Sequence, residues 1–230
     1  MSKDDNGGIL ASENEEADKM AFLFDWSEME TEEYTHDTQN GSVVELGERN
    51  YIMLTGSGDE QSDTFMRDAA AMLKLGQFMT EAPKHGIEID GFRNYVHYPL
   101  NVSWQGDFTS PHKQYQMLMK HPNFMPKAAV DAAIAQLGAD DPIIKQIHYG
   151  RFEEGLEAQI GHVGVINQQT IDQLQQFIAA SPFEVDTRDT AHRELYLNDI
   201  TKVPREQWQT ILRQRVVAKG NTGRYDIIYN

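Results

Sequence analysis

Residues 156–164 of this chain read LEAQIGHVG, an apolar segment that predicts a β-strand ending in a glycine-bounded turn. Residues 51–58, YIMLTGSG, have the same form: a strand-like run followed by two closely spaced glycines. An amphipathic helix is predicted after each segment because apolar residues recur at helical spacing. These positions are Phe65, Ala69, Met72 and Leu73 after residues 51–58, and Ile171, Leu174 and Ile178 after residues 156–164.

Extended chain is predicted after each of these helices. Residues 95–100, YVHYPL, follow the first helix, and residues 192–197, HRELYL, with 210–216, TILRQRV, follow the second. The order strand, glycine turn, helix, extended chain therefore occurs twice, which indicates a weak internal duplication. Strands at hairpin-like spacing alternating with helices predict an α+β fold with a mainly antiparallel sheet. Two copies can pair into one sheet, with the helices on one face and a cleft between the copies.

Two further helices are predicted in the middle of the chain. One begins at Pro111, continues through Tyr115 and ends before Pro122. The other begins near Pro126 and ends at Gly138, which is expected to form a left-handed C-cap.

The composition excludes several classes of protein. The 230 residues include no cysteine, which rules out disulfide frameworks, thiolate metal sites and cysteine nucleophiles. The net charge of −16 and the lack of a basic stripe argue against a nucleic-acid partner. No apolar run is long enough to span a membrane, and the first residues lack a secretory signal, so a cytoplasmic protein is expected.

Acidic residues are concentrated at the N-terminus. Residues 1–50 carry 14 acidic and 3 basic side chains, so we predict an acidic, flexible arm over residues 1–20. The expected globular domain covers residues 21–217, with repeats at about 42–120 and 145–217, and a C-terminal tail follows at 218–230.

The predicted strand at residues 192–197 carries the candidate catalytic groups. Alternation places His192, Glu194 and Tyr196 on one face, and Leu195 and Leu197 on the opposite face, which we expect to pack under the helices. A carboxylate between an imidazole and a phenol can attract a cation, accept a proton or hold a water molecule. Enclosure by aromatic side chains would raise the pKa of Glu194. The alternative is a strand whose polar face is simply in solvent.

Aromatic residues elsewhere can line the same hollow and bind planar or cationic ligands. Taken singly, each is more often a core side chain. Eight histidines show no metal-ligand spacing, and no P-loop, dinucleotide, zincin or α/β-hydrolase motif occurs, so we expect neither a metal nor a cofactor. The predicted ligand-binding residues are Tyr95, His97, Trp104, Tyr115, His162 and His192.

Several segments, in this order along the chain, carry a family resemblance. They are YIMLTGSG (51–58), Pro99-Leu100 with Trp104, MLMKHPNF (117–124), FEEGLEAQIGHVG (152–164), HRELYLND (192–199) and TILR (210–213). Together they resemble the GyrI-like (gyrase-inhibitor-like) small-molecule-binding proteins in their stand-alone form, over roughly residues 21–217. The segments at 152–164 and 192–199 are the most specific.

This resemblance implies duplicated strand–helix–strand–strand units with a ligand groove between the repeats. Relatives are effector modules of multidrug-sensing regulators, binders of toxic compounds and, in some stand-alone members, hydrolases that open the cyclopropane of DNA-alkylating cyclopropanoid natural products. Glu194 resembles the pocket acid of the family, with Tyr196 as its neighbour. Three departures imply a less acidic and less aromatic pocket: Asn101 stands where the family has Glu, and Lys113 and Tyr115 stand where it has Trp.

Two functions from different classes remain open. The first is a binding protein, a monomer or weak dimer, that sequesters a hydrophobic, planar or cationic small molecule. The second is a hydrolase of strained electrophiles, in which Glu194 orients or deprotonates water and Tyr196 donates a hydrogen bond to the carbonyl that gains charge. A transcription regulator is disfavoured because no helix-turn-helix precedes the domain. An inhibitor that mimics DNA through its acidic residues rests on residues 1–50 alone.

Overall fold

The computed structural model describes residues 22–105, 113–189 and 191–220, and the acidic arm predicted over residues 1–20 lies outside them. The strands are β1 (Ser42–Gly58), β2 (Leu100–Gln105), β3 (Lys113–His121), β4 (His148–Val163), β5 (Phe183–Val185), β6 (His192–Tyr196) and β7 (Gln209–Ala218). The helices are α2 (Trp26–Met29), α3 (Asp63–Thr80), α4 (Lys127–Leu137) and α5 (Gln168–Ala180), with short 3₁₀ turns at Ala82–His85, Ile144–Gln146 and Arg205–Gln207.

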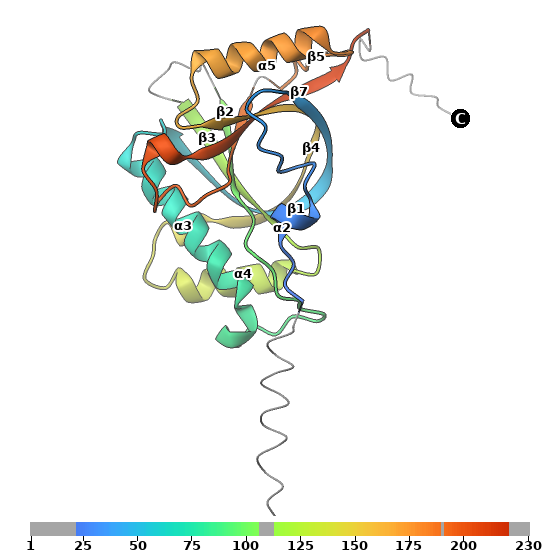
Figure 1. The fold of residues 1–230 in the computed structure, drawn as a ribbon. Coiled ribbons are helices and arrows are strands. Elements are labelled where there is room, and N and C mark those ends of the chain that lie inside the picture. The colour runs from blue at the N-terminus through green and yellow to red at the C-terminus, as the bar shows by residue number, and fades with distance from the viewer. Residues whose placement is uncertain (1–21, 106–112, 190, 221–230) are drawn as a thin grey trace, which may run out of the picture.

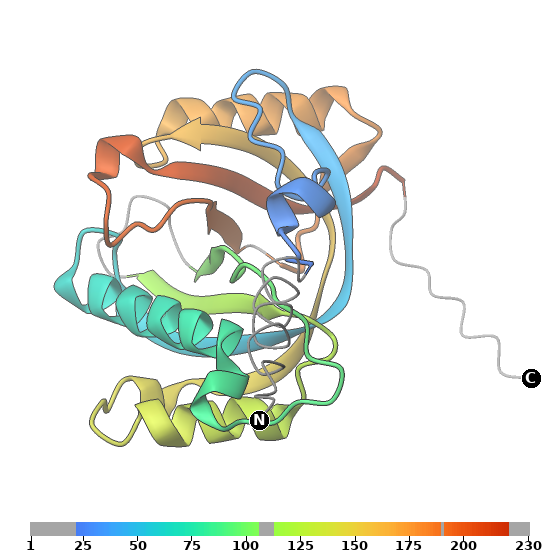
Figure 2. The same ribbon diagram turned by 60° about the horizontal axis from the view of Figure 1, so that its bottom comes forward.

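The sheet closes into a barrel. Its strands follow the order β4-β1-β3-β2-β6-β7, all neighbours are antiparallel, and β4 also pairs with β7. The short strand β5 pairs with β7 outside this ring. Helix α5 lies at one end of the molecule, and α3 and α4 lie toward the other (Figure 1; Figure 2). The predicted α+β class and antiparallel sheet are confirmed, and closure leaves the barrel itself with no unpaired edge.

The internal duplication is confirmed by the strand order. The first unit is β1-α3-β2-β3, in which β3 lies between β1 and β2. The second is β4-α5-β6-β7, in which β7 lies between β4 and β6, and β5 is an addition after α5. The units meet along β1–β4 and along β2–β6. Each unit therefore supplies a three-stranded half of the barrel with one helix on its outer face.

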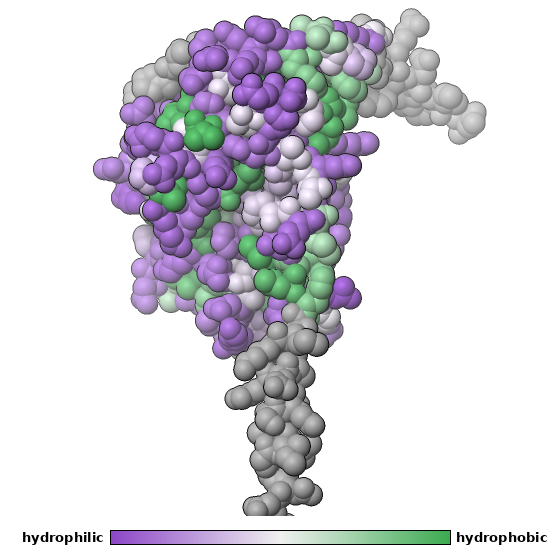
Figure 3. All heavy atoms as spheres, in the orientation of Figure 1, coloured by the Kyte–Doolittle hydropathy of each residue, from purple (hydrophilic) through white to green (hydrophobic). Residues whose placement is uncertain are grey.

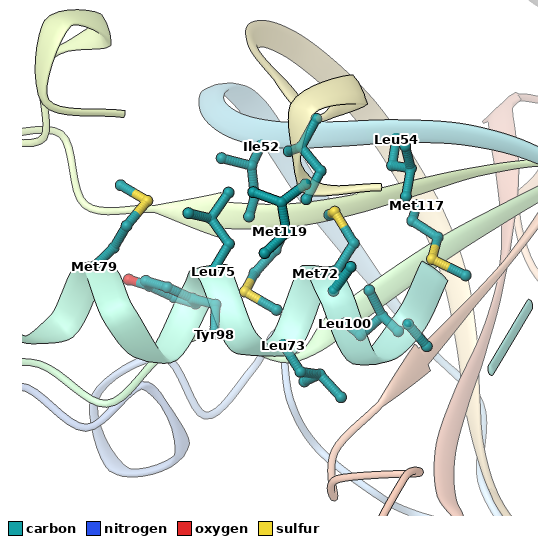
Figure 4. Close-up of a cluster of buried hydrophobic side chains, with 14 of the residues drawn as sticks. Ile52, Leu54, Met72, Leu73, Leu75, Met79, Tyr98, Leu100, Met117 and Met119 are labelled. Carbon is teal, nitrogen blue, oxygen red and sulfur yellow. The ribbon is translucent and has the colours of Figure 1, made fainter. Parts of the chain in front are cut away.

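Helix α3 forms where the sequence predicts it. Ser62 caps its N-terminus by accepting a hydrogen bond from the Phe65 amide at 3.2 Å. Its buried face packs on strands β1 and β3 (Figure 4). The side chains in this contact include Met72 and Leu75 from the helix and Ile52, Met117 and Met119 from the strands. This cluster is the main core of the first unit.

Three local predictions were wrong. Residues 111–119 were expected to be helical, but Lys113–His121 form β3, because Lys113, Tyr115 and Met117 are buried at strand period. The glycines at residues 56–58 lie within β1 rather than in a turn, and a Cβ at Gly56 would come within 2.4 Å of the Tyr115 ring. Gly138 ends α4 in a right-handed conformation, with φ −74°.

The inner face of the barrel is filled by charged side chains. Arg193 forms an ion pair with Glu157 and contacts Asp189 at 2.8 Å, and the Nε of Arg213 donates to Gln159 at 2.9 Å. One cavity there, lined by Asn101, Leu195 and Arg213 among others, holds about 10 Å³, space for roughly one water molecule. The described side chains around it form a buried polar network.

None of the helices in the described part of the chain is long and apolar enough to cross a membrane.

The buried His121, at the end of β3, is expected to make the unfolding free energy fall in acid. Burial lowers the pKa of its imidazole to about 3, and Nε2 has no hydrogen-bond partner among the described residues. The unfolded chain therefore takes up a proton below about pH 6.5 that the folded chain does not. We expect the unfolding free energy to fall by about 1.5 kcal/mol from this group between pH 6.5 and 5, and His121→Leu to remove that part of the decrease. Urea unfolding of the parent and of His121→Leu at pH 6.5 and 5 measures this decrease. An equal decrease in the two proteins would contradict the prediction.

Candidate functional site

Strand β6 lies between the two helix-covered parts of the outer face. Helix α3 packs on β1, β2 and β3, and α5 packs on β4, β5 and β7. Glu194 is paired with Val102 of β2 and Leu212 of β7. These neighbours belong to the cores under α3 and α5 respectively, so Glu194 faces outward at the junction of the repeats.

The two faces of β6 are oriented opposite to the prediction: the face with Glu194 and Tyr196 lies on the side of the helices, and the face with Leu195 points into the barrel. Tyr196 packs against Phe65 of α3 at 6.4 Å between ring centroids, whereas Arg193 and Leu195 point into the barrel. Leu195 was expected to lie under the helices. The reason for the difference is the closure of the barrel, because both faces of β6 are then buried. Burial of Arg193 is possible because Glu157 and Asp189 neutralise it on the inner face.

The Glu194 carboxylate is held by its two neighbours on the strand. The Tyr196 hydroxyl donates to Oε2 at 2.6 Å, and His192 Nε2 lies 3.3 Å from Oε1. Burial by itself would raise the pKa of Glu194, but hydrogen bonds from His192 and Tyr196 and the charges of His192 and Lys113 hold it below its ordinary value. The expected upward shift was wrong. Glu194 is therefore a buried carboxylate that stays ionised at neutral pH.

Tyr196 serves to fix this carboxylate. Burial raises the pKa of its phenol well above 10, as does the neighbouring charge of Glu194. The hydroxyl has one proton, which it donates to Glu194. It cannot donate to a substrate carbonyl at the same time, so the structure supports a positioning role for Tyr196.

Four aromatic side chains surround Glu194 and the two residues that hold it, Tyr196 and His192. We call these residues and their aromatic neighbours the Glu194 group. Phe65 stacks on Trp104 at 5.2 Å and meets the edge of Tyr115 at 5.5 Å. Trp104 and Tyr115 are themselves 5.4 Å apart, and Trp208 packs edge-on against Tyr196 at 5.4 Å. The Tyr115 hydroxyl is fixed by Asp68 at 2.6 Å. These contacts form an aromatic wall next to the Glu194 carboxylate.

Lys113 adds a positive charge that sequence reasoning did not assign to the site. Its Nζ lies 4.7 Å above the Trp104 ring and 3.2 Å from Glu60, and the side chain is 4% exposed. Its charge also lowers the pKa of Glu194. Lys113 was placed in a predicted helix. The alternation of buried residues along β3, which sets Lys113 beside Tyr115 and Met117, is the signal that could have revealed it.

The predicted ligand-binding residues separate into distinct groups. Trp104, Tyr115 and His192 lie around Glu194. His162 shares the outer face, two strands away across Thr210, but its ring nitrogens contact the Val165 carbonyl and the Thr170 hydroxyl. Its imidazole therefore supports the start of α5.

Tyr95 and His97 are not brought to Glu194. Tyr95 packs with Phe92 and Phe124, and the His97 backbone carbonyl accepts a hydrogen bond from Trp26. Asn101, where the family has an acid, faces the barrel interior and donates to Glu154 at 3.0 Å. Its identity therefore does not change the charge beside Glu194.

Comparison with known proteins establishes the fold. No protein-family model and no curated protein matches the chain. A hydrolase from Listeria innocua aligns with a TM-score of 0.71 and 24% identity, over 84% of this chain and all of that one. A second hydrolase from the same organism gives 0.73 and 23%, over 85% of this chain and all of its own. An uncharacterized conserved protein of that organism also gives 0.73 and 23%, over 84% and 100% of the two chains.

The side chains around Glu194 are suited to polar chemistry. No set of three or more His, Asp or Glu side chains within the described ranges is arranged to hold a metal ion. An ionised carboxylate, an imidazole and an ammonium group instead meet at an aromatic wall. Such a set can orient a nucleophilic water molecule and stabilise negative charge on a bound planar molecule.

Proposed function

We propose that this chain is a GyrI-like small-molecule-binding protein that hydrolyses an uncharged, planar and strained electrophile at Glu194. The observation that carries the proposal is the buried, ionised Glu194 carboxylate, fixed by Tyr196 and His192 next to Trp104. Keeping a carboxylate ionised in an apolar place is costly unless hydrogen bonds and charges compensate it. A purely apolar ligand would not require that arrangement.

The position of Lys113 favours hydrolysis over sequestration of a cation. Lys113 already places an ammonium group over Trp104, the face that a cationic ligand would otherwise occupy. Glu60 holds this ammonium group at 3.2 Å, so a cationic ligand would have to displace it. The hydrolases from Listeria innocua that share the fold add support from an independent direction.

The reaction adds one water molecule across a strained carbon–carbon bond. Glu194 orients the water and accepts its proton while the oxygen attacks a methylene of a cyclopropane joined in spiro fashion to a cyclohexadienone. The bond between that methylene and the ring carbon breaks, and its electron pair generates an aromatic phenolate. Lys113 stabilises the phenolate charge. The phenolate oxygen then takes up the proton released from Glu194. The product is a phenol bearing a hydroxyethyl group, and no redox partner is required.

A defined probe tests the proposal. The full chain is incubated with a spiro-cyclopropyl cyclohexadienone joined to a planar aromatic amide, and the products are separated by chromatography. Protein-dependent formation of the phenolic alcohol is expected. Binding detected by thermal shift without any product would replace hydrolysis by sequestration, and neither binding nor product would refute both.

Tryptophan fluorescence locates the bound probe. We expect titration with this probe to quench the emission, and Trp104→Phe to remove most of the change because Trp104 lies in the wall beside Glu194. Trp26 is the control, since it packs with Tyr34 outside the Glu194 group. Trp26→Phe should leave the quenching intact, and a quench lost in that variant instead would assign the probe to another place.

A further inference from the structure

A second hollow lies where the described chain begins, away from Glu194. It has a volume of about 310 Å³ and shares no lining residue with the Glu194 group. A more open hollow of about 450 Å³ adjoins it, since Phe22 and Arg93 line both. Figure 3 shows apolar surface on the lower part of the described chain. We call the first hollow the aromatic pocket; its walls include Phe22, Phe24, Arg93, Tyr95, Tyr98 and Phe124.

The walls of the aromatic pocket are held in place by backbone pairing. Phe24 donates to the Asn94 carbonyl and accepts from the Val96 amide, both at 2.9 Å, which forms a bridge between Phe24 and Tyr95. Tyr95 and Phe124 pack edge to face at 5.9 Å, and Phe24 and Tyr98 lie 6.4 Å apart. The pocket is therefore preformed, at the small end of the ~300–1,000 Å³ typical of ligand sites.

One charged group in this pocket lacks the partner that such groups usually have. Arg93, at the exposed side, makes no ion pair with any residue that the structure describes, although the chain carries a net charge of −16. An unpaired guanidinium beside an aromatic hollow suits an anionic group attached to an apolar body.

We propose that the aromatic pocket is a second ligand site, separate from Glu194, which binds an amphiphilic carboxylate. The apolar body lies among Phe24, Tyr98 and Phe124, and the carboxylate pairs with Arg93 at the mouth. The pocket therefore selects a medium-chain or aromatic acid over an alcohol or an amine of the same length.

Competition binding with the full chain tests this site. The probe is 8-anilinonaphthalene sulfonate, an aromatic anion whose fluorescence rises in apolar surroundings, and the competitors are decanoate, decanol and decyltrimethylammonium. We expect decanoate to displace it at least tenfold more effectively than the cation. Arg93→Gln should weaken decanoate about tenfold and change decanol by less than about twofold, because only the acid loses a charge-assisted contact. Arg151→Gln, which removes the same charge from an exposed pair with Glu48, should have no effect.

A blocking variant keeps the test decisive. Asn123 is exposed at the pocket, so Asn123→Trp obstructs the pocket without altering the core, and it should abolish displaceable binding. Probe binding that survives Asn123→Trp, or that is lost in Trp104→Phe instead, would overturn the assignment. Equal competition by the acid and the cation would overturn the anionic ligand class. Neither result bears on turnover at Glu194, so the two proposals fail separately.

Discussion

Glu194→Gln should lower the rate of ring opening by roughly 10²–10⁴-fold, the usual contribution of a positioned proton acceptor. The substitution keeps the size of the side chain and can still accept the Tyr196 hydrogen bond. It removes the charge and the basicity that activate water, while the aromatic wall of Trp104 and Phe65 remains. Affinity for the uncharged spiro-cyclopropyl probe should therefore change by less than about threefold.

Two matched variants separate catalysis from structure. Glu184→Gln, in the exposed part of β5, removes one carboxylate far from the wall and should leave turnover unchanged. Tyr196→Phe should reduce turnover less than Glu194→Gln, because the carboxylate remains but loses one of its holding contacts. Single-turnover rates and binding by thermal shift measure both effects. Parent-like turnover in a folded Glu194→Gln protein would remove Glu194 from the mechanism.

The pH profile gives a further readout of the same side chain. The pKa of Glu194 lies below its ordinary value because its hydrogen bonds and neighbouring charges outweigh burial. The carboxylate is then present in its active form throughout the pH range above about 5. Loss of activity on acidification to pH 5 is therefore not expected from Glu194. A fall in activity between neutral pH and pH 5 that is absent only from Glu194→Gln would contradict the lowered pKa.

The sequence predicted the fold well where the pattern is local. Apolar spacing identified α3 and α5, and the glycine-bounded strands identified the duplication. Closure of the barrel could not be predicted, because it depends on pairing between β1 and β4 and between β4 and β7, which no local pattern encodes. The helix expected at residues 111–119 failed for a related reason. Tyr115 and Met119, four positions apart, are compatible with either period, and the pairing of β3 with β1 and β2 decides between them.

The candidate site was predicted in part. Alternation along β6 correctly grouped His192, Glu194 and Tyr196 on one face. It could not show that this face is the one covered by the helices, because in a closed barrel both faces of a strand are buried. The lowered pKa of Glu194 was not predicted because burial alone was considered: hydrogen bonds from His192 and Tyr196 outweigh burial, and Lys113 of β3 adds its charge. Tyr95 and His97 were grouped with Glu194 by residue type alone, and the structure places Tyr95 in the aromatic pocket.

Arg193→Met should be the most destabilising of the substitutions considered. The Arg193 side chain is 2% exposed and pairs with Glu157, which is 0% exposed, inside the barrel. Removing one member of a buried ion pair leaves the other charge without compensation and costs about 3–5 kcal/mol. For a domain of this size, we expect the melting temperature to fall by roughly 6–20 °C. Arg151→Met breaks the exposed pair with Glu48 and should cost less than about 1 kcal/mol.

The double variant identifies the cause of that loss. Burial raises the pKa of Glu157 to about 8 although Arg193 opposes this rise, so the ion pair is fully charged only above about pH 8. Above that pH, Arg193→Met with Glu157→Gln removes the uncompensated charge and should recover at least about half of the lost stability. Urea unfolding of the parent, both single variants and the double variant gives the coupling free energy. Additive losses would show that Arg193 stabilises the barrel through Asp189 and packing on Phe152 instead of through Glu157.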